Sequence, residues 1–227
     1  MIISHKYKFI FVKNRKVAGS SFQACIGKHC GRSDIFTVSG DIPSQNTKGV
    51  WNPCGDILLA PNWETRFQIL SDFTHFNKFK PHMGARLIQA RIPKKTWDSY
   101  YKFCIERNPW DKTLSFYHMK KHNPDFTNMS FESFLSRCPS LCSDFDRYSD
   151  VNGNIIVDRI LRFESLLSDL SDLCEKLGIP FNGDLGFKIN SQFRNDRRDY
   201  RDVYTNSQKQ IVKNVYKKEI EIMGYEF

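Results

Sequence analysis

The stretch FIFVKNRKVAGSSFQA, residues 9–24, joins an apolar run to a loop of small and hydroxylated residues. The β-branched and aromatic residues from Tyr7 to Val12 predict a core strand, and apolar residues from Phe22 onward recur at helical spacing. Backbone N–H groups at a helix start are unpaired and carry partial positive charge. The stretch therefore predicts a strand, an anion-binding loop and a helix.

Within that loop, Lys16 supplies a full positive charge, while Ala18 and Gly19 keep side chains small. The hydroxyls of Ser20 and Ser21 add donors for an oxyanion. Lys16 precedes the glycine, whereas a Walker A motif places its lysine after the glycines, so a P-loop kinase is disfavoured. A Gly-Ser turn that caps a helix beside an exposed lysine is the alternative interpretation.

Two further strand-to-helix transitions follow. Residues 101–105 alternate apolar and polar side chains, and Asn108-Pro109 then supplies an N-cap and a first-turn proline. Residues 160–164 predict a short strand, followed by a leucine stripe that ends at Gly178. Strands that alternate with helices predict an α/β fold with a central parallel sheet flanked by helices.

Length and composition favour one domain, residues 1–227, because 40% of the residues are hydrophobic and no linker or repeat interrupts the chain. A capping box at Thr205–Gln208 predicts a last helix that ends at Gly224. No run of about 18 apolar residues and no leader pattern is present, which predicts a cytoplasmic protein without membrane insertion.

The charge and cysteine patterns limit the possible partners. The formal net charge of +9 favours anionic ligands such as nucleotides, nucleic acids or acidic glycans. Seven cysteines at irregular spacing predict neither a disulfide framework nor a zinc site. A nucleic-acid-binding domain remains an alternative function, although the chain lacks an aromatic RNA-binding signature, a DNA-binding helix pair and a zinc module.

A second anion-ready loop lies at Arg107-Asn-Pro-Trp-Asp111, again at the carboxyl end of a predicted strand, and Ser115 follows on the helix. Ligands of open parallel sheets bind outside the carboxyl ends of the strands. The two loops are therefore expected to serve two groups of one ligand.

With these motifs the chain resembles the sulfotransferases that use 3′-phosphoadenosine 5′-phosphosulfate (PAPS), in particular the carbohydrate sulfotransferase branch with its bacterial and viral relatives. KFIFVKNRKVAGSS is similar to the family's phosphosulfate loop, usually F-V-H-I-P-K-T-A-G-T-S. FCIERNPWDKTLSFY is similar to its 3′-phosphate motif, usually F-x-x-V-R-N-P-W-D-R-x-x-S-x-Y. The resemblance covers most of the chain and implies the P-loop-kinase-like sulfotransferase fold. Arg15 stands where the family usually has proline, and Glu106 replaces an apolar residue.

The resemblance implies a role for each matching position. Lys16 would contact the phosphosulfate and stabilise the leaving group, while Arg107 and Ser115 would bind the 3′-phosphate. Arg15 would strengthen anion binding, whereas Glu106 would pair with Arg107 or point to the other sheet face. The residues expected to bind PAPS are Arg15, Lys16, Val17, Ala18, Gly19, Ser20, Ser21, Arg107 and Ser115.

Sulfuryl transfer also needs a group that removes the acceptor proton, and a histidine is suited to this near neutral pH. Pro81-His82-Met-Gly-Ala resembles a family element that lies upstream of the arginine motif, which makes His82 the predicted general base. His75 and the carboxylate of Glu64 are the alternatives. No metal is expected.

The expected activity is therefore PAPS-dependent O-sulfation of a hydroxyl, with a saccharide as the expected acceptor. A catalytically inactive PAPS-binding fold is a further alternative. The basic stretch from Arg194 to Arg201 predicts either a clamp for an anionic group or a solvated, self-paired loop. The tryptophans Trp51, Trp63 and Trp97 are either sugar-stacking residues or partly buried structural ones.

Overall fold

The computed structural model describes residues 1–37, 63, 66–67, 70–71, 78–138, 140–186 and 198–227. Its strands are β1 (Ile2–Ser4), β2 (Phe9–Phe11), β3 (Ile35–Phe36), β4 (Tyr101–Glu106) and β5 (Arg159–Arg162). Its α-helices are α1 (Gly19–Gly27), α4 (Ala85–Arg91), α5 (Lys94–Ser99), α6 (Pro109–Lys120), α7 (Phe131–Arg137), α8 (Phe145–Tyr148), α9 (Leu166–Leu177), α10 (Asn206–Val215) and α11 (Lys217–Met223). Two 3-10 turns, η1 (Pro124–Phe126) and η3 (Tyr200–Asp202), complete these elements.

The strands form one mixed sheet in the order β3-β1-β2-β4-β5. Strands β2, β4 and β5 are parallel, as predicted, and place their carboxyl ends at one edge. Strand β1 is antiparallel to both β2 and β3, so antiparallel strands extend the predicted central parallel sheet on one side. The cause is local, because the short turn between Ser4 and Phe9 permits only a hairpin, with Lys8 at a φ of 54°.

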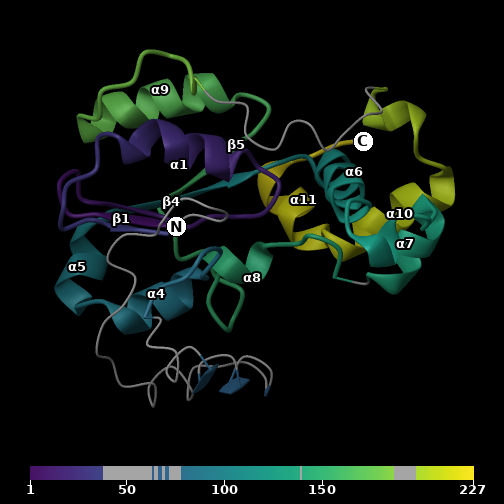
Figure 1. Ribbon diagram of the computed structural model, residues 1–227, viewed down its shortest axis with the longest axis horizontal. Helices are drawn as coiled ribbons and strands as arrows, with labels where there is room; N and C mark the ends of the chain where they lie inside the picture. The colour runs from purple at the N-terminus through teal and green to yellow at the C-terminus, as the bar shows by residue number, and fades with distance from the viewer. Residues whose placement is uncertain (38–62, 64–65, 68–69, 72–77, 139, 187–197) are drawn as a thin grey trace.

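Helices cover both faces of this sheet (Figure 1). On one face, α1 and α9 pack against Phe9, Phe11 and Phe103 through apolar side chains such as Phe22 and Leu170. On the other face, α4, α5 and α8 cover side chains of the same strands that point the opposite way, including Ile10 and Val12. The central strands are therefore buried on both faces, which explains their continuous apolar composition.

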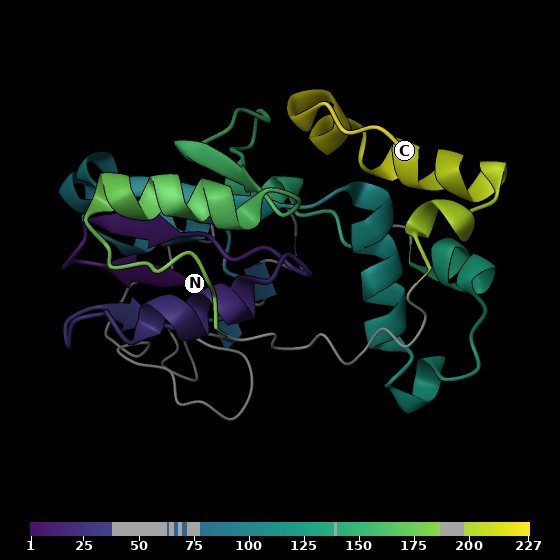
Figure 2. The ribbon, with the colours of Figure 1, turned by 90° about the horizontal axis from the view of Figure 1, so that it is seen from above.

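A group of helices lies beyond the carboxyl edge of the sheet. Figure 2 shows α6, α7, α10 and α11 gathered to one side of the sheet and its covering helices. They share an aromatic cluster that includes Trp110, Phe134, Tyr204 and Tyr216. Helix α6 follows β4 directly, so it connects the sheet to this group.

The predicted helix signals are present in the structure. The Asn108 side chain accepts from the Trp110 amide, and Gly178 ends α9 in the left-handed conformation. Thr205 and Gln208 form the reciprocal capping box of α10. The single predicted C-terminal helix is instead two, α10 and α11, which meet at Tyr216, whose phenol accepts from the Cys142 amide at 3.0 Å.

Within the described ranges, no helix is both long and apolar enough to cross a membrane. Every cysteine in the same ranges is a free thiol.

Candidate functional site

The loop between β2 and α1 has an alternating backbone conformation. Lys16 and Ala18 lie in the left-handed region, with φ of 60° and 58°, whereas Val17 and Gly19 have negative φ. Alternation of this kind turns successive N–H groups toward one side and forms a concave anion site, called a nest. For non-glycine residues the left-handed conformation costs energy, and such strain concentrates at functional sites. The predicted anion loop therefore has a backbone shape that is typical of anion-binding nests, and anion binding here stays a prediction.

Helix α1 begins inside this loop. Ala18 is its N-cap residue and makes no side-chain cap, so it leaves the first amides of the helix without that partner. Ser20 is half-buried and Ser21 is buried at the same point. The structure thus brings the helix N-terminus, the nest and both hydroxyls together at the carboxyl edge of the sheet.

Arg107 connects the second predicted motif to the first. Its Nη1 donates to the Lys16 carbonyl oxygen at 3.1 Å, and its Nε donates to Asp111 at 2.8 Å. The guanidinium also lies over the Phe163 ring, 4.1 Å from the ring centre. Because a carboxylate, a carbonyl and an aromatic ring hold it from three directions, the guanidinium is fixed beside the loop. Burial and the charge of Arg107 together lower the pKa of Lys16 from its usual value.

Ser115 lies one turn further along α6. It is four residues after Asp111 and half-buried, so it shares the helix face that starts beside Arg107. This placement agrees with the expectation that Arg107 and Ser115 act on one group, which stays a prediction.

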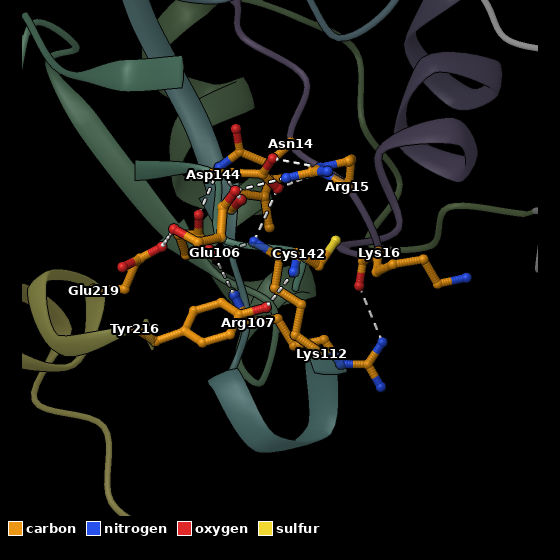
Figure 3. A network of polar contacts seen from close by, with 12 residues as sticks. Asn14, Arg15, Lys16, Glu106, Arg107, Lys112, Cys142, Asp144, Tyr216 and Glu219 are labelled. Carbon is orange, nitrogen blue, oxygen red and sulfur yellow. Dashed lines mark hydrogen bonds and ion pairs between the residues drawn. The ribbon is translucent and has the colours of Figure 1, made fainter. Parts of the chain in front are cut away.

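A buried ionic cluster underlies both motifs, and Figure 3 shows it from close by. Lys112 on α6 is fully buried, and its Nζ lies 2.9 Å from both Glu106 and Asp144. Asp144 also binds Arg15 at 2.8 Å and Arg147 at 2.6 Å. The cluster joins the end of β4, the start of α6, the first loop and the segment before α8.

The two departures from the family pattern both belong to this cluster. The Arg15 side chain donates to Asp144 and to the Ser143 carbonyl oxygen, and its backbone N–H donates to Asp144 at 2.7 Å. Glu106 accepts from Lys112 and from Asn14, so its carboxylate serves the cluster and not the Arg107 guanidinium. The expected role of Arg15 as an anion ligand stays a prediction, since Asp144 already binds its guanidinium.

Burial and the unequal sharing of cations set the ionisation of the cluster. Burial raises the pKa of Glu106 to about 7, because Lys112 offsets only part of the desolvation cost. Burial also acts against the charge of Asp144, but Lys112, Arg15 and Arg147 outweigh it and hold its pKa below the usual range. Asp144 is therefore the ionised centre of the cluster at neutral pH.

His82 lies against the first loop, and its role as a general base stays a prediction. Its Nδ1 is 3.1 Å from the Lys13 carbonyl oxygen, so Nδ1 carries the proton and Nε2 has the free lone pair. The Arg147 guanidinium donates to the His82 carbonyl oxygen. Burial, with the nearby charges of Lys13 and Arg147, lowers the pKa of His82 to about 4. The imidazole is therefore neutral and able to accept a proton at physiological pH.

Other candidates lie partly outside the described residues. The alternative bases His75 and Glu64 fall there, as do Arg194, Arg197 and Trp51. Arg201 pairs with Asp199 at 3.4 Å and is exposed, which fits the interpretation of a self-paired loop. Trp97 is buried beneath the sheet, which excludes it from sugar stacking.

Sequence reasoning missed several residues of the site. Asp111 could have been found as the partner of Arg107, since the two are four residues apart at a helix start. Lys112 and Asp144 gave no signal, because a buried lysine and its distant carboxylate look like ordinary surface charges in sequence. Lys13 also gives no signal in sequence, because no local pattern shows that it is buried and bonded to Ser20.

The left-handed backbone at Ala18 leads to a prediction. Ala18→Gly is expected to keep or raise the free energy of unfolding by up to about 1 kcal/mol, since glycine adopts this conformation without strain. Ala18→Val is expected to lower it by about 1–2 kcal/mol. Urea denaturation measures both. Ala24→Gly within α1 is the control and should lower stability by about 1 kcal/mol. Equal stability of the Ala18 variants would contradict the assigned backbone.

The buried cluster leads to a second prediction. Lys112→Met is expected to lower the free energy of unfolding by about 3–5 kcal/mol, because it leaves Glu106 and Asp144 buried together without their shared cation. Adding Glu106→Gln should recover part of that loss by removing one of the two carboxylates. Urea denaturation of the single and double variants tests this, and independent, additive losses would argue against a shared ion cluster.

Comparison with solved structures identifies the fold. The crystal structure of mouse sulfotransferase SULT7A1 complexed with PAP aligns with a TM-score of 0.50, covering 96% of this chain and 86% of that chain. The sequence identity is 14%, so the likeness concerns the fold alone. The predicted sulfotransferase fold is thereby confirmed, while the carbohydrate branch stays a prediction. No protein-family model matches the chain.

Comparison with curated proteins identifies a relative. An uncharacterized protein of Archaeoglobus fulgidus is 37% identical over 113 residues, which span 48% of this chain and 92% of the archaeal protein. Because the match covers nearly all of the archaeal protein at this identity, the chain belongs to the same protein family as that protein.

Proposed function

We propose that the chain is a PAPS-dependent sulfotransferase that moves a sulfuryl group to an acceptor hydroxyl. The observation that carries the proposal is the hydrogen bond from Arg107 to the Lys16 carbonyl, because it joins two anion-binding motifs 91 residues apart. The sulfotransferase fold supports the same conclusion. A carbohydrate hydroxyl is the acceptor that the resemblance favours, and residues 1–227 act as one cytoplasmic domain.

The residues present fit a cofactor that carries two anionic groups, as PAPS does. The nest at residues 16–19, the start of α1 and the Ser20 hydroxyl would hold the 5′-phosphosulfate. Arg107 and Ser115 would hold the 3′-phosphate beside it. When bound, PAPS supplies a sulfuryl group on a phosphate that leaves readily. The basic character of the loop matches this doubly anionic ligand.

The chain's own residues supply positioning, charge and a proton acceptor. Lys16 and the amides of the nest place positive charge at the departing phosphate oxygen, as transfer of a highly charged group requires. His82 Nε2 accepts the proton of the acceptor hydroxyl, while Nδ1 stays bonded to the Lys13 carbonyl oxygen. The contacts of Arg107 with Asp111, the Lys16 carbonyl and the Phe163 ring fix its guanidinium, so it is preorganised to bind the 3′-phosphate.

Nucleotide binding is the first test of this function. Adenosine 3′,5′-bisphosphate at 100 times its dissociation constant should stabilise the protein by about 2.7 kcal/mol and raise its melting temperature. Lys16→Ala and Arg107→Ala should each remove most of the rise. Lys28→Ala, an exposed lysine after α1, is the matched control and should keep it.

The outcome separates the alternative functions. An unchanged melting temperature in the wild type contradicts the proposal. Steeply salt-dependent binding of oligonucleotides, unaffected by the bisphosphate, would instead favour nucleic-acid binding. Bisphosphate binding without transfer of labelled sulfate to glycan, lipid or small-alcohol acceptors would favour the inactive fold.

The proposed base gives a separate prediction. His82→Asn should lower turnover by about 100- to 10,000-fold while nucleotide affinity is kept, because asparagine tolerates the positive φ of 59° and can donate to the Lys13 carbonyl. His5→Asn, a histidine bonded to Tyr100, is the control. Near-normal turnover of His82→Asn would move the role to His75 or Glu64.

The same base sets an expected pH dependence. Protonation of His82 abolishes its function, and its pKa is lowered to about 4, so the acid limb of kcat/KM should lie near pH 4 and not near 6.5. The free energy of unfolding should also fall as the pH drops from 6.5 toward 4. In this range the unfolded chain binds a proton at His82 that the folded chain does not yet bind. A limb that remains in His82→Asn would contradict the assignment.

A further inference from the structure

Lys13 is a buried lysine directly after β2, at the entrance to the anion loop. Its side chain is 2% exposed, and its Nζ donates to the Ser20 Oγ at 3.0 Å. Ser20 is a first-turn residue of α1, a helix of nine residues. Lys13 is thus a second cation beneath the loop, distinct from Lys16.

Among the residues that the structure describes, none supplies a carboxylate partner for the charge of Lys13. Across the parts of the chain that the structure describes, no Asp or Glu oxygen lies within ion-pair distance of its Nζ, whereas buried Lys112 has two. A buried ammonium without a counter-ion is costly, and burial accordingly lowers the pKa of Lys13 to about 8. An anion bound at the loop would supply the missing negative charge.

The bond to Ser20 determines what the serine hydroxyl can do. An ammonium group only donates, so the Ser20 oxygen accepts from Lys13 and its own hydrogen is free for another acceptor. A hydrogen-bond acceptor for that hydrogen would lie in front of the helix N-terminus and the nest, where the proposed anion binds. A positive charge behind a hydroxyl also strengthens the hydroxyl as a donor.

Gly19 makes room for this arrangement. A Cβ atom placed at Gly19 would lie 3.1 Å from Lys13 Cγ and 3.4 Å from Lys13 Cε. The lysine stem therefore runs along the glycine backbone on its way to Ser20. This contact accounts for a glycine here even though its φ is negative.

We propose that Lys13 is a positioning residue of the anion site, which orients the Ser20 hydroxyl toward the bound phosphosulfate and supplies the second positive charge. The inference rests on the proposed function, because it assumes that this loop binds the 5′ end of the cofactor. Lys13 acts through Ser20 and does not itself contact the reacting atoms.

Calorimetric titration of the full chain with adenosine 3′,5′-bisphosphate tests the inference. Lys13→Met should weaken binding by about 10- to 100-fold, and Ser20→Ala by a similar factor. The double variant should lose less affinity than the product of the two single factors, because part of the effect of Lys13 passes through the Ser20 hydroxyl. Lys102→Met is the matched control, because Lys102 is a buried lysine on β4 that bonds Tyr100 and Asp158 away from the loop.

Inorganic pyrophosphate as a second probe separates the two proposals. If the wild type binds the bisphosphate and Lys13→Met binds it equally well, the role of Lys13 is overturned and the proposed function stands. If the wild type binds pyrophosphate only, the proposed function fails. The role of Lys13 in binding an anion then stands if Lys13→Met binds pyrophosphate more weakly than the wild type, and fails if it binds equally well. If it binds neither probe, both proposals fail.

The pH dependence of binding gives a readout that a merely structural role would not change. Wild-type affinity should decline as the pH rises above about 8, where Lys13 loses its proton, and Lys13→Met should lack this step. The Met1 amino group and His82 also face Lys13, but burial lowers both pKa values, His82 to about 4. Lys16 is a further titrating cation of the loop, because burial and Arg107 lower its pKa, so Lys16→Ala is measured beside Lys13→Met. A step near pH 8 that survives in Lys13→Met and is lost in Lys16→Ala contradicts the inference.

Discussion

The buried Asp144 carboxylate forms ion pairs with Arg15, Lys112 and Arg147. The relative positions of the parts of the candidate site depend on these three ion pairs. Through Arg15 the carboxylate holds the first loop, through Lys112 the start of α6, and through Arg147 the backbone of His82. Buried ion pairs add little net stability, because desolvation offsets most of their attraction. What they impose is relative position, since a displaced partner would leave a buried charge uncompensated. The cluster therefore fixes the first loop, the start of α6 and His82 relative to one another.

The anion loop carries strain that the surrounding contacts must balance. Lys16 and Ala18 both adopt positive φ without being glycine, which costs about 1–2 kcal/mol each. Arg107 bonds the Lys16 carbonyl, and the Arg15 amide bonds Asp144. These bonds act on the backbone itself, so they hold the loop amides in one orientation, which the proposed anion would meet already formed. A preorganised loop spends less of the binding energy on its own ordering.

Local sequence signals predict the helix ends and the two loops, whereas they do not predict which distant residues contact one another. Asn108, Gly178 and Thr205 act within a few residues of themselves, so their caps follow from sequence alone. The antiparallel strand β1 has only three residues, too few for a periodic pattern. The partners of Lys112 depend on segments six and 32 residues away, and no local pattern records that a lysine is buried. The two loops were found because each is a local motif, while the cluster between them was not.

Arg15 stands where the phosphosulfate loop that this sequence resembles usually has proline. Proline, the usual residue of the related motif, has a fixed φ and no amide hydrogen. Arg15 instead uses both its amide and its guanidinium on Asp144, which replaces the rigidity of a ring by three hydrogen bonds in the segment 143–144. The same carboxylate is the reason that Lys112 can be buried in α6. Arginine at position 15 is therefore a structural partner of Asp144, and its predicted contact with an anion would have to be made by the guanidinium that Asp144 already binds.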